Sequence, residues 1–325
     1  MTTGTPLETI DFEAAAARLD GVVRRTRLLP FPVEDERVEL RLKLECEQET
    51  GAFKARGAWN NISCLTEAER RAGVVATSSG NHGKALAWAA QRAGVKATIF
   101  MPANSYANKI QACRDHGAEV VLTETRQEAE AACAARVAAG AVLVHPYDAR
   151  GTVEGAGTTG LEIAQDWPEV EVVVLPVGGG GLLAGSSLAI RRTLGGAVRV
   201  FGVEPAGSPN MTLGLEAGGP VDVDPITTKV QGLCPLQAGR LNVQIALECV
   251  DGVFTLEDDE IYAGQRALVR AGHTVEPAGA ATFAWVRGGL PVELLSGRSA
   301  ADPLRVAAVI SGGNADPAQL EELRR

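Results

Sequence analysis

Lys54 combines a reactive side chain with surroundings that favour chemistry at its amine. It follows Phe53 in the segment 50–57, whose other residues are mostly small. An apolar environment disfavours the charged ammonium, so it lowers the pKa of a lysine and leaves a nucleophilic amine that can form a Schiff base. Most lysines are instead solvated surface charges, and for Lys54 itself both interpretations remain open. The lysines expected to be such surface charges are Lys43, Lys96 and Lys109.

Residues 178–181 are four consecutive glycines between an apolar run and a helical segment. Glycine permits positive φ angles and close backbone approach, so successive amides can point at an anion. The helix that follows adds free N–H groups and its positive end, which favour a phosphate. The alternative without a ligand is a tight strand-to-helix turn. A dinucleotide fingerprint does not fit, because G-x-G-x-x-G started at Gly178 puts Leu183 on its third glycine.

Two further polar loops follow apolar runs. Residues 78–83 read Ser-Ser-Gly-Asn-His-Gly, and their hydroxyl, amide and backbone N–H groups suit a carboxylate. The alternative is an ordinary N-cap and turn, because serine and asparagine are favoured there as well. Ser311 ends a hydrophobic run, and its hydroxyl could share one hydrogen bond with a heteroaromatic nitrogen. Its alternative is a plain strand-ending turn.

The elements that must position these residues follow an α/β pattern. Short apolar runs, turns and helical segments alternate, which favours parallel sheets flanked by helices. The expected strands are residues 38–44, 73–77, 96–101, 119–123, 141–145, 171–176, 198–203 and 304–310. The expected helices are residues 84–93, 107–116, 126–139, 157–165, 182–194, 258–271 and 277–287. In open α/β sheets ligands bind at the carboxyl ends of strands, where all three polar loops stand, so the sequence predicts one shared site.

Composition argues against several classes of partner. The net charge of −9 and the pI near 5.1 disfavour nucleic acid and anionic membranes. The cysteines lack C-x-x-C spacing, which is typical of reduced residues, and the histidines give no pair at i, i+4 for zinc. Residues 1–10 lack the pattern of a secretion signal, and no apolar stretch reaches the ~18 residues that span a bilayer. We therefore expect a cytoplasmic protein without nucleic-acid or membrane partners.

Four motifs, in order along nearly the whole chain, resemble those of the fold-type II pyridoxal-phosphate enzymes, in the serine/threonine dehydratase and serine racemase branch. Residues 52–58 are similar to the lysine motif S-F-K-x-R-G-A, and residues 78–83 match S-S-G-N-H-G. Residues 176–182 match P-V-G-G-G-G-L, and residues 311–314 match S-G-G-N. Residues 276–279 also resemble the E-P-x-x-G segment of the branch.

This resemblance implies a two-lobed α/β fold, like that of the tryptophan synthase β subunit, with parallel and mixed sheets flanked by helices. It divides the chain into a large cofactor-binding domain, residues 1–68 and 150–325, and a small mobile domain, residues 69–149. It also implies a homodimer. The chain ends soon after the last motif, so we expect no regulatory domain of the kind found on biosynthetic threonine dehydratases.

The resemblance further implies roles for individual residues. Lys54 would carry the cofactor as a Schiff base and later remove the α-proton of the substrate, with Ser79 on the opposite face of the ring. Asn81 would contact the phenolic oxygen of the cofactor, and Ser311 its pyridine nitrogen. The residues implied in holding the cofactor are Phe53, Lys54, Asn81, Gly178, Gly179, Gly180, Gly181, Leu182, Glu276 and Ser311. Those implied around the substrate carboxylate are Ser78, Ser79, Asn81 and His82.

The activity implied is a pyridoxal 5'-phosphate-dependent dehydration of L-threonine, L-serine or a related hydroxy amino acid, giving a 2-oxo acid and ammonia. Ser311 is neutral and does not enforce a protonated pyridine, so the cofactor is a weaker electron sink that suits fast loss of a β-leaving group. A serine or hydroxyaspartate racemase is the alternative, because Lys54 and Ser79 could exchange the α-proton from both faces. A β-replacing synthase of the cysteine synthase type is disfavoured by His82, where such enzymes usually have threonine. A non-catalytic ligand-binding module is the remaining alternative.

Three segments depart from the pattern of the branch. Residues 228–232 stand where the branch usually carries an A-D-G segment beside the cofactor, which leaves the preferred substrate side chain open. A divalent-cation site, for magnesium or calcium, would use Glu204, Ser208 through its carbonyl, and Asn210, which stands in place of an aspartate. Ala52 replaces the serine of the lysine motif, a change that leaves the expected chemistry intact.

Overall fold

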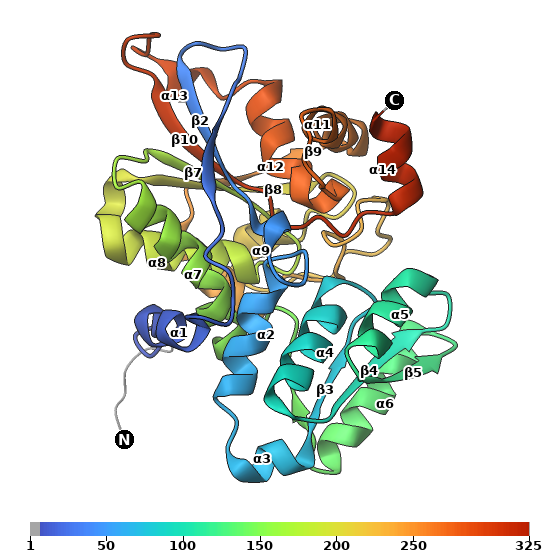
Figure 1. Cartoon of the computed structure of the whole chain (residues 1–325). Coiled ribbons are helices and arrows are strands. Elements are labelled where there is room, and N and C mark those ends of the chain that lie inside the picture. The colour runs from blue at the N-terminus through green and yellow to red at the C-terminus, as the bar shows by residue number, and fades with distance from the viewer. Residues whose placement is uncertain (1–6, 325) are drawn as a thin grey trace.

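Among residues 7–324, which the computed structural model describes, ten strands form two separate sheets (Figure 1). The large sheet has the order β1-β2-β10-β7-β8-β9, and its neighbours run parallel except for β1 and β2. The small sheet has the order β5-β4-β3-β6 and is parallel throughout. The strands are β1 (Leu28–Phe31), β2 (Val38–Lys43), β3 (Val74–Thr77), β4 (Ala97–Pro102), β5 (Glu119–Thr123), β6 (Val142–Leu143), β7 (Val172–Pro176), β8 (Arg199–Pro205), β9 (Gly252–Leu256) and β10 (Leu304–Val309).

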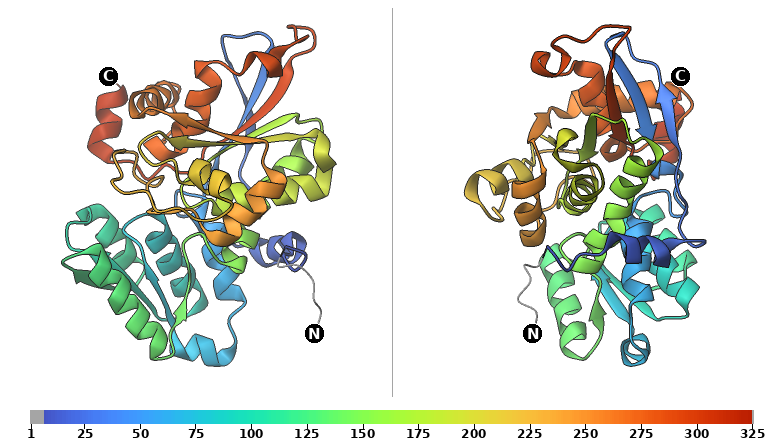
Figure 2. Two further views of the ribbon diagram at one scale, coloured as in Figure 1. Left: turned by 180° about the vertical axis from the view of Figure 1, so that it is seen from behind. Right: turned by 90° about the vertical axis from the view of Figure 1, so that its left-hand side faces the viewer.

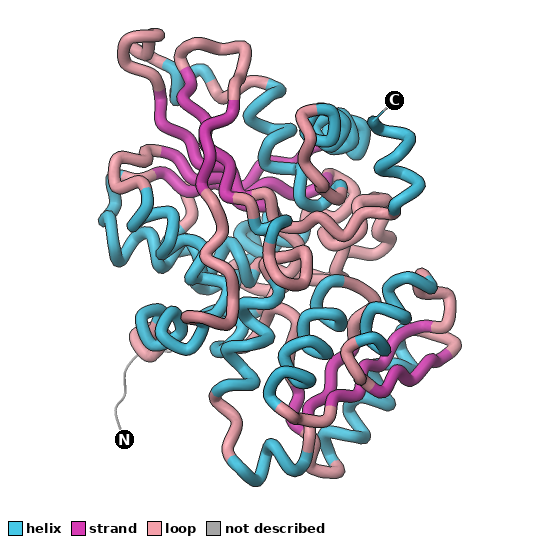
Figure 3. The backbone as a smooth tube through the Cα atoms, in the orientation of Figure 1, coloured by secondary structure: helices cyan, strands magenta, loops and turns pink. Residues whose placement is uncertain are grey.

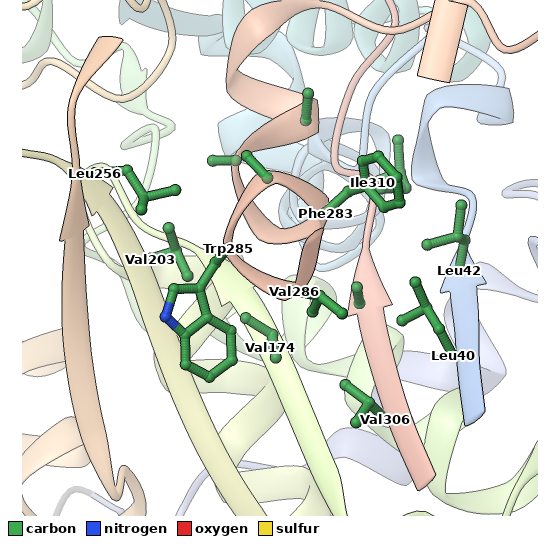
Figure 4. Close-up of a cluster of buried hydrophobic side chains, with 14 of the residues drawn as sticks. Leu40, Leu42, Val174, Val203, Leu256, Phe283, Trp285, Val286, Val306 and Ile310 are labelled. Atoms are coloured by element: carbon green, nitrogen blue, oxygen red, sulfur yellow. The ribbon is translucent and has the colours of Figure 1, made fainter. Parts of the chain in front are cut away.

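Helices cover both faces of the large sheet. Successive residues of a strand point to opposite faces, and in β7 Val172 and Val174 are buried on one face while Val173 and Leu175 are buried on the other. On the first face α12 (Pro277–Gly288) packs aromatic and apolar side chains, among them Trp285, against the strands (Figure 4). On the second face α7 (Arg150–Asp166) and α8 (Gly181–Leu194) contribute the apolar cover. Burial on both faces explains why this strand is a continuous apolar run in the sequence.

Most helices around the large sheet come from the C-terminal half of the chain. They are α1 (Phe12–Leu19), α7 (Arg150–Asp166), α8 (Gly181–Leu194), α9 (Asn210–Ala217), α10 (Arg240–Cys249), α11 (Asp258–Arg270), α12 (Pro277–Gly288), α13 (Val292–Leu295) and α14 (Pro317–Arg324), with the 3-10 helices η1 (Glu45–Glu47) and η2 (Gly195–Ala197).

The small sheet and its helices form a second part of the molecule, which both further views show beside the large sheet (Figure 2). Its helices are α3 (Glu67–Ala72), α4 (Asn81–Ala93), α5 (Ala107–Asp115) and α6 (Arg126–Ala138). Helix α2 (Lys54–Ser63) lies between the two parts, because it packs against α4 on one side and α7 on the other. Ala55, Ala58 and Ile62 of α2 are buried in the same apolar cluster as Leu86 of α4. The helix that begins with Lys54 is therefore held from both sides.

The α/β class, with parallel and mixed sheets flanked by helices, is confirmed, but the expected elements were incomplete. Strands β1 and β9 and helices α1, α2, α3, α9, α10, α13 and α14 were not among them. The elements that were expected differ mainly at their ends. Helix α4 begins at Asn81, three residues earlier than expected, so Asn81 and His82 belong to its first turn. Helix α7 begins at Arg150 rather than at residue 157. All four strands of the small sheet lie within residues 69–149. The domain boundaries at these positions and the mobility of the small domain stay predictions.

Two expectations concern the ends of the chain and membranes. Residues 1–6 of the segment expected not to be a secretion signal lie outside the described residues. Within residues 7–324, no helix has the length and apolar character needed to cross a bilayer.

Lys43 corrects one prediction, because it is not a surface charge. Its side chain is fully buried, and its Nζ donates to Glu162 Oε2 at 2.6 Å and to the carbonyl of Thr26 at 2.8 Å. Strand β2 lies between β1 and β10, and its last residue, Lys43, meets Glu162 of α7. Lys109 is half-buried rather than free in solvent, and Lys96 is exposed as expected.

Candidate active site

Loops that follow the carboxyl ends of β3, β6, β7 and β10 gather between the two sheets (Figure 3). Together with the start of α2 they enclose a cavity of about 430 Å³. The expected site residues that line it are Phe53, Lys54, Ser78, Ser79, Asn81, His82, Gly178, Gly179, Gly180, Gly181, Leu182, Glu276 and Ser311. The structure therefore brings together every residue expected to act on cofactor or substrate. Their individual roles stay predictions.

Lys54 is the first residue of α2, and its side chain lies in the cavity. Its Nζ donates a hydrogen bond to the carbonyl of Pro146 at 2.7 Å and lies 4.8 Å from the centre of the Phe53 ring. Burial lowers the pKa of Lys54 to about 8, because the charged ammonium loses hydration that one carbonyl does not replace. Close to neutral pH this amine is therefore present in part as the nucleophilic free base.

A buried ionic network anchors the same helix. Arg56 donates to Glu45 Oε1 at 2.7 Å and to Glu162 Oε1 at 2.7 Å, and all three side chains are almost completely enclosed. Lys43 adds its own bond to Glu162, so two cations and two carboxylates balance each other. Glu45 belongs to η1 and Glu162 to α7. The network thus fixes the first turn of α2, and with it the origin of the Lys54 side chain.

The glycine run forms a turn that has no room for side chains. A Cβ on Gly179 would lie 2.2 Å from Cγ of Tyr147, and Gly180 has a φ of +88°. Helix α8 begins at Gly181, so the N–H groups of its first turn, including that of Leu182, lack partners within the helix. Close backbone approach and free N–H groups at a helix start are what a phosphate needs.

Asn81, Glu276 and Asn314 form a hydrogen-bonded chain at one wall of the cavity. Asn81 Nδ2 donates to Glu276 Oε1, and Asn81 Oδ1 accepts from Asn314 Nδ2 at 2.9 Å. Lys84 Nζ in turn donates to Asn314 Oδ1 at 3.0 Å. Burial raises the pKa of Glu276, which favours its neutral form. The chain fixes which way the amide of Asn81 points.

The loop at residues 78–82 presents mostly neutral polar groups. Ser78 Oγ accepts from the N–H groups of Gly80 and Gly83, at 3.3 and 3.1 Å, so it shapes the loop and the start of α4. His82 Nε2 lies 2.8 Å from the carbonyl of Val144, to which it donates. Burial, together with the nearby charge of Lys54, lowers the pKa of His82 to about 3. His82 is therefore a neutral ring and supplies no positive charge to a carboxylate.

Ser311 follows β10 and is buried at the cavity wall. Its carbonyl accepts from the N–H of Phe53 at 3.0 Å, so the end of β10 is tied directly to the start of α2. A Cβ on the adjacent Gly312 would lie 2.2 Å from Glu276 Oε1. The hydroxyl of Ser311 is a neutral group that can donate or accept one hydrogen bond toward a ligand.

The residues expected to bind a divalent cation lie elsewhere, and they already have partners. The Glu204 carboxylate accepts from the N–H groups of Met211 and Thr212, each at 2.9 Å, which caps the start of α9. Asn210 Nδ2 donates to Ser208 Oγ at 2.8 Å. In the part of the chain that the structure describes, no group of three or more His, Cys, Asp or Glu side chains could hold a metal ion. The cation site stays a prediction. A bound cation would have to compete with these hydrogen bonds for the side chains of Glu204 and Asn210.

Several residues that line the cavity or hold its lining residues were missed by sequence reasoning. Pro146 and Tyr147 reach the site from the loop after β6, and Lys84 and Asn314 join the chain that holds Asn81. A signal existed for Tyr147, because the segment His-Pro-Tyr follows the last strand of the small sheet at its carboxyl end. For Lys84 there was none, because its partner Asn314 lies 230 positions away.

Observations on this structure alone support the fit of pyridoxal phosphate to these residues. The glycine turn has no side chains to keep a phosphate away from its backbone, the free N–H groups of α8 suit that phosphate, and a lysine of lowered pKa suits the aldehyde. The cavity also offers Asn81 and Ser311 as neutral hydrogen-bonding groups.

Comparisons with known proteins agree. Residues 19–312 match the family model described as "Pyridoxal-phosphate dependent enzyme". The L-threonine ammonia-lyase of Thermotoga maritima is 39% identical over 318 residues, which are 96% of this chain and 77% of that protein. Among solved structures, maize serine racemase superimposes with a TM-score of 0.86 at 30% identity, covering 96% of this chain and 94% of that one. The processed threonine deaminase isoform 2 of Solanum lycopersicum superimposes with a TM-score of 0.88 at 30% identity, covering 99% and 89%. The chain therefore belongs to the fold-type II family of pyridoxal-phosphate dependent enzymes, in the branch of the serine and threonine dehydratases and serine racemases.

Proposed function

We propose that this chain is a pyridoxal-phosphate-dependent ammonia-lyase that converts L-threonine and L-serine to a 2-oxo acid and ammonia. One observation carries the proposal: the amine of Lys54, the glycine turn at residues 178–181 and the loop at residues 78–82 line a single cavity. The similarity to an L-threonine ammonia-lyase over 96% of the chain supports the same reaction class.

The residues of the chain divide the work of this reaction. When bound, the cofactor withdraws electrons from the α-carbon of the amino acid. Lys54 Nζ removes the α-proton, and its lowered pKa makes the neutral, proton-accepting amine available near neutral pH. The turn at residues 178–181 and the first N–H groups of α8 would hold the phosphate. The hydroxyl and amide groups of Ser79 and Asn81 orient the substrate carboxylate.

Loss of the β-hydroxyl completes the elimination. The α-hydrogen and the β-hydroxyl leave as water, and the released enamine takes up water again as it hydrolyses to the 2-oxo acid and ammonia. Ser311 is the neutral group assigned to the pyridine nitrogen. A neutral partner would make the bound cofactor a weaker electron sink, which suits fast loss of the β-hydroxyl.

Racemisation of serine is the second candidate, and Ser79 is the observation that favours it. Ser79 lines the same cavity as Lys54, and among the described residues its hydroxyl has no hydrogen-bond partner. Such a hydroxyl is free to return a proton to the α-carbon from a second face. The similarity to maize serine racemase, at 30% identity, is compatible with this activity.

One assay separates these activities. The protein is loaded with pyridoxal phosphate and incubated with L-threonine and L-serine, and 2-oxo acid, ammonia and D-serine are measured. We expect 2-oxo acid and ammonia in equal amounts, little D-serine, and no product with Lys54→Ala. D-serine as the main product would support the racemase instead, and a product that forms only with an added thiol would support a β-replacing synthase.

The proposal extends to the setting of the enzyme. We expect a cytoplasmic homodimer whose small domain, residues 69–149, moves relative to the rest when substrate binds. Light scattering during size-exclusion chromatography measures the molar mass of the protein and so tests the dimer directly. Hydrogen exchange with and without L-serine measures the motion, and protection that does not change at the domain boundaries would contradict it.

A further inference from the structure

A second cavity, of about 600 Å³, adjoins the one that contains Lys54. The residues that line both cavities, here called the shared wall, are Tyr106, Lys109, Gln231, Cys234 and Glu276. The loop at residues 78–82 and the shared wall line the same first cavity, so a substrate held by that loop can direct a long side chain toward the second cavity. The methyl group of threonine would leave nearly all of this space unused. The inference that follows rests on the proposed ammonia-lyase function.

Lys109 of the shared wall and the neighbouring Lys84 place two positive charges close together. Lys109 belongs to α5 and is half-buried, and among residues 7–324 its ammonium has neither a hydrogen-bond partner nor an ion pair. Lys84 of α4 lies close enough for the two charges to repel, which adds to the effect of burial in lowering the pKa of Lys84. Lys84 is held by the side-chain oxygen of Asn314, which also lines the second cavity. Two neighbouring cations without a carboxylate partner are unfavourable until an anion binds.

The acidic groups near this wall do not neutralise these charges. Glu276 is only 5% exposed, and its carboxyl oxygen is bonded to Asn81. Burial raises the pKa of Glu276, and the opposing effect of Lys109 and Lys84 is smaller. The anionic form of Glu276 is therefore disfavoured. Asp316, which also lines the second cavity, accepts from the N–H groups of Ala318 and Gln319 at the start of α14. Gln231 adds a neutral amide at the shared wall. The second cavity therefore suits an anionic side chain better than a methyl group.

We propose that the second cavity receives the side chain of the substrate, that Lys109 pairs with a carboxylate on the β-carbon, and that the preferred substrates are acidic β-hydroxy amino acids of the 3-hydroxyaspartate class. The chemistry of the site is unchanged. The α-hydrogen and the β-hydroxyl leave as water, one water is regained on hydrolysis, and the products are a dicarboxylic 2-oxo acid and ammonia. Lys109 acts here as a specificity-determining residue that does not touch the reacting atoms.

The test compares holoenzyme variants on two substrates. Initial rates of ammonia release give kcat/KM for L-threo-3-hydroxyaspartate and for L-serine, and the ratio of the two is the readout. In Lys109→Met the ratio should fall by about 10- to 100-fold, mainly through KM, because one charge-assisted pair is lost. Lys109→Arg keeps the charge and should restore most of the ratio. Lys96→Met removes an exposed lysine that lines neither cavity and should leave the ratio as in the wild type.

Other outcomes overturn the inference. A ratio that stays within about threefold of the wild-type value in Lys109→Met would remove Lys109 from substrate selection. Preference of the wild type for L-threo-phenylserine over 3-hydroxyaspartate would show a cavity for neutral, bulky groups. If Lys109→Met changes only the response to added succinate and leaves the substrate ratio intact, the cavity is an effector site.

A failure of the proposed function is distinguishable from a failure of this inference. If no substrate is deaminated, the ammonia-lyase proposal fails. In that case calorimetric titration of the holoenzyme with succinate and with butyrate still tests the cavity. Succinate should bind more tightly than butyrate, and Lys109→Met should remove the difference. Equal binding of both acids to the wild type would refute the anionic cavity.

Discussion

Lys54 shows how burial converts an ordinary ammonium into a reagent. One backbone carbonyl, that of Pro146, accepts a hydrogen bond from its Nζ, and no carboxylate among the described residues lies within ion-pair distance of it. Loss of hydration therefore outweighs the interactions gained, and the pKa falls to about 8. Lys43 is fully buried as well, but its Nζ lies 2.6 Å from Glu162 Oε2, a carboxylate partner that Lys54 does not have.

The pH dependence of cofactor binding follows from this residue. Only the neutral amine attacks an aldehyde, so the rate constant for reaction of the apoprotein with pyridoxal phosphate should rise with pH and reach half its plateau near pH 8. Stopped-flow absorbance between pH 6 and 10.5 measures it. Nα-acetyllysine, whose pKa is about 10.4, is the reference, and Lys54→Met should give no signal. A midpoint near that of the reference would contradict the effect of burial.

The sign of the matching stability change can be stated as well. The folded-state pKa of Lys54 lies below that of an unfolded lysine, so between about pH 8 and pH 10.5 the unfolded chain binds the extra proton. Stability contributed through this residue therefore rises with pH across that window. It is lowest below pH 8, where the folded protein must bury the charged form.

At the scale of elements, strand ends and helix starts build the site. The glycine turn joins β7 to α8, the polar loop joins β3 to α4, and Lys54 opens α2. The glycine turn could be predicted from sequence, because the reason for each glycine is local backbone freedom. The start of α4 at Asn81 was harder to predict, because the N-cap residue Gly80 has no side chain that could cap the helix. The contact of Tyr147 with Gly179 was also out of reach, because it depends on how two sheets are placed.

The glycine turn allows a matched pair of variants. In Gly179→Ala the new Cβ would lie 2.2 Å from Cγ of Tyr147, so either the turn or the tyrosine must shift. We expect the Kd for pyridoxal phosphate to rise about tenfold or more, a loss of at least ~1.4 kcal/mol. In Gly196→Ala the new Cβ meets nothing within 4 Å, and the Kd should stay at the wild-type value. Fluorescence titration measures both, and equal Kd values would contradict the assigned phosphate site.

For the whole molecule, the placement of α2 between the two parts matters most. It packs against α4 on the side of the small sheet and α7 on the side of the large sheet, and it carries both Lys54 and Arg56. The motif around Lys54 was recognised from sequence, whereas the partners of Arg56 were not. Glu45 lies 11 and Glu162 lies 106 positions away in other elements, η1 and α7, so no periodicity within α2 pairs them with Arg56. Long-range charge pairing of this kind depends on the complete fold.

Stability should depend strongly on this network. Arg56→Met leaves the buried carboxylates of Glu45 and Glu162 without their shared cation, at a cost of roughly 3–5 kcal/mol in the free energy of unfolding. Arg37→Met removes an exposed arginine paired with Asp35 and should barely shift the urea midpoint. Urea unfolding followed by circular dichroism compares the two. Similar midpoints for both variants would mean that the network does not hold α2 in place.

The covalent attachment of the cofactor to Lys54 is the claim on which the assigned active site rests. The protein is loaded with pyridoxal phosphate, reduced with borohydride and digested, and the peptides are analysed by mass spectrometry. We predict one phosphopyridoxyl group per chain, on Lys54, and none there in Lys54→Met. A label mainly on Lys84, Lys109 or any other lysine, or no label above that of an unfolded control, would contradict the account.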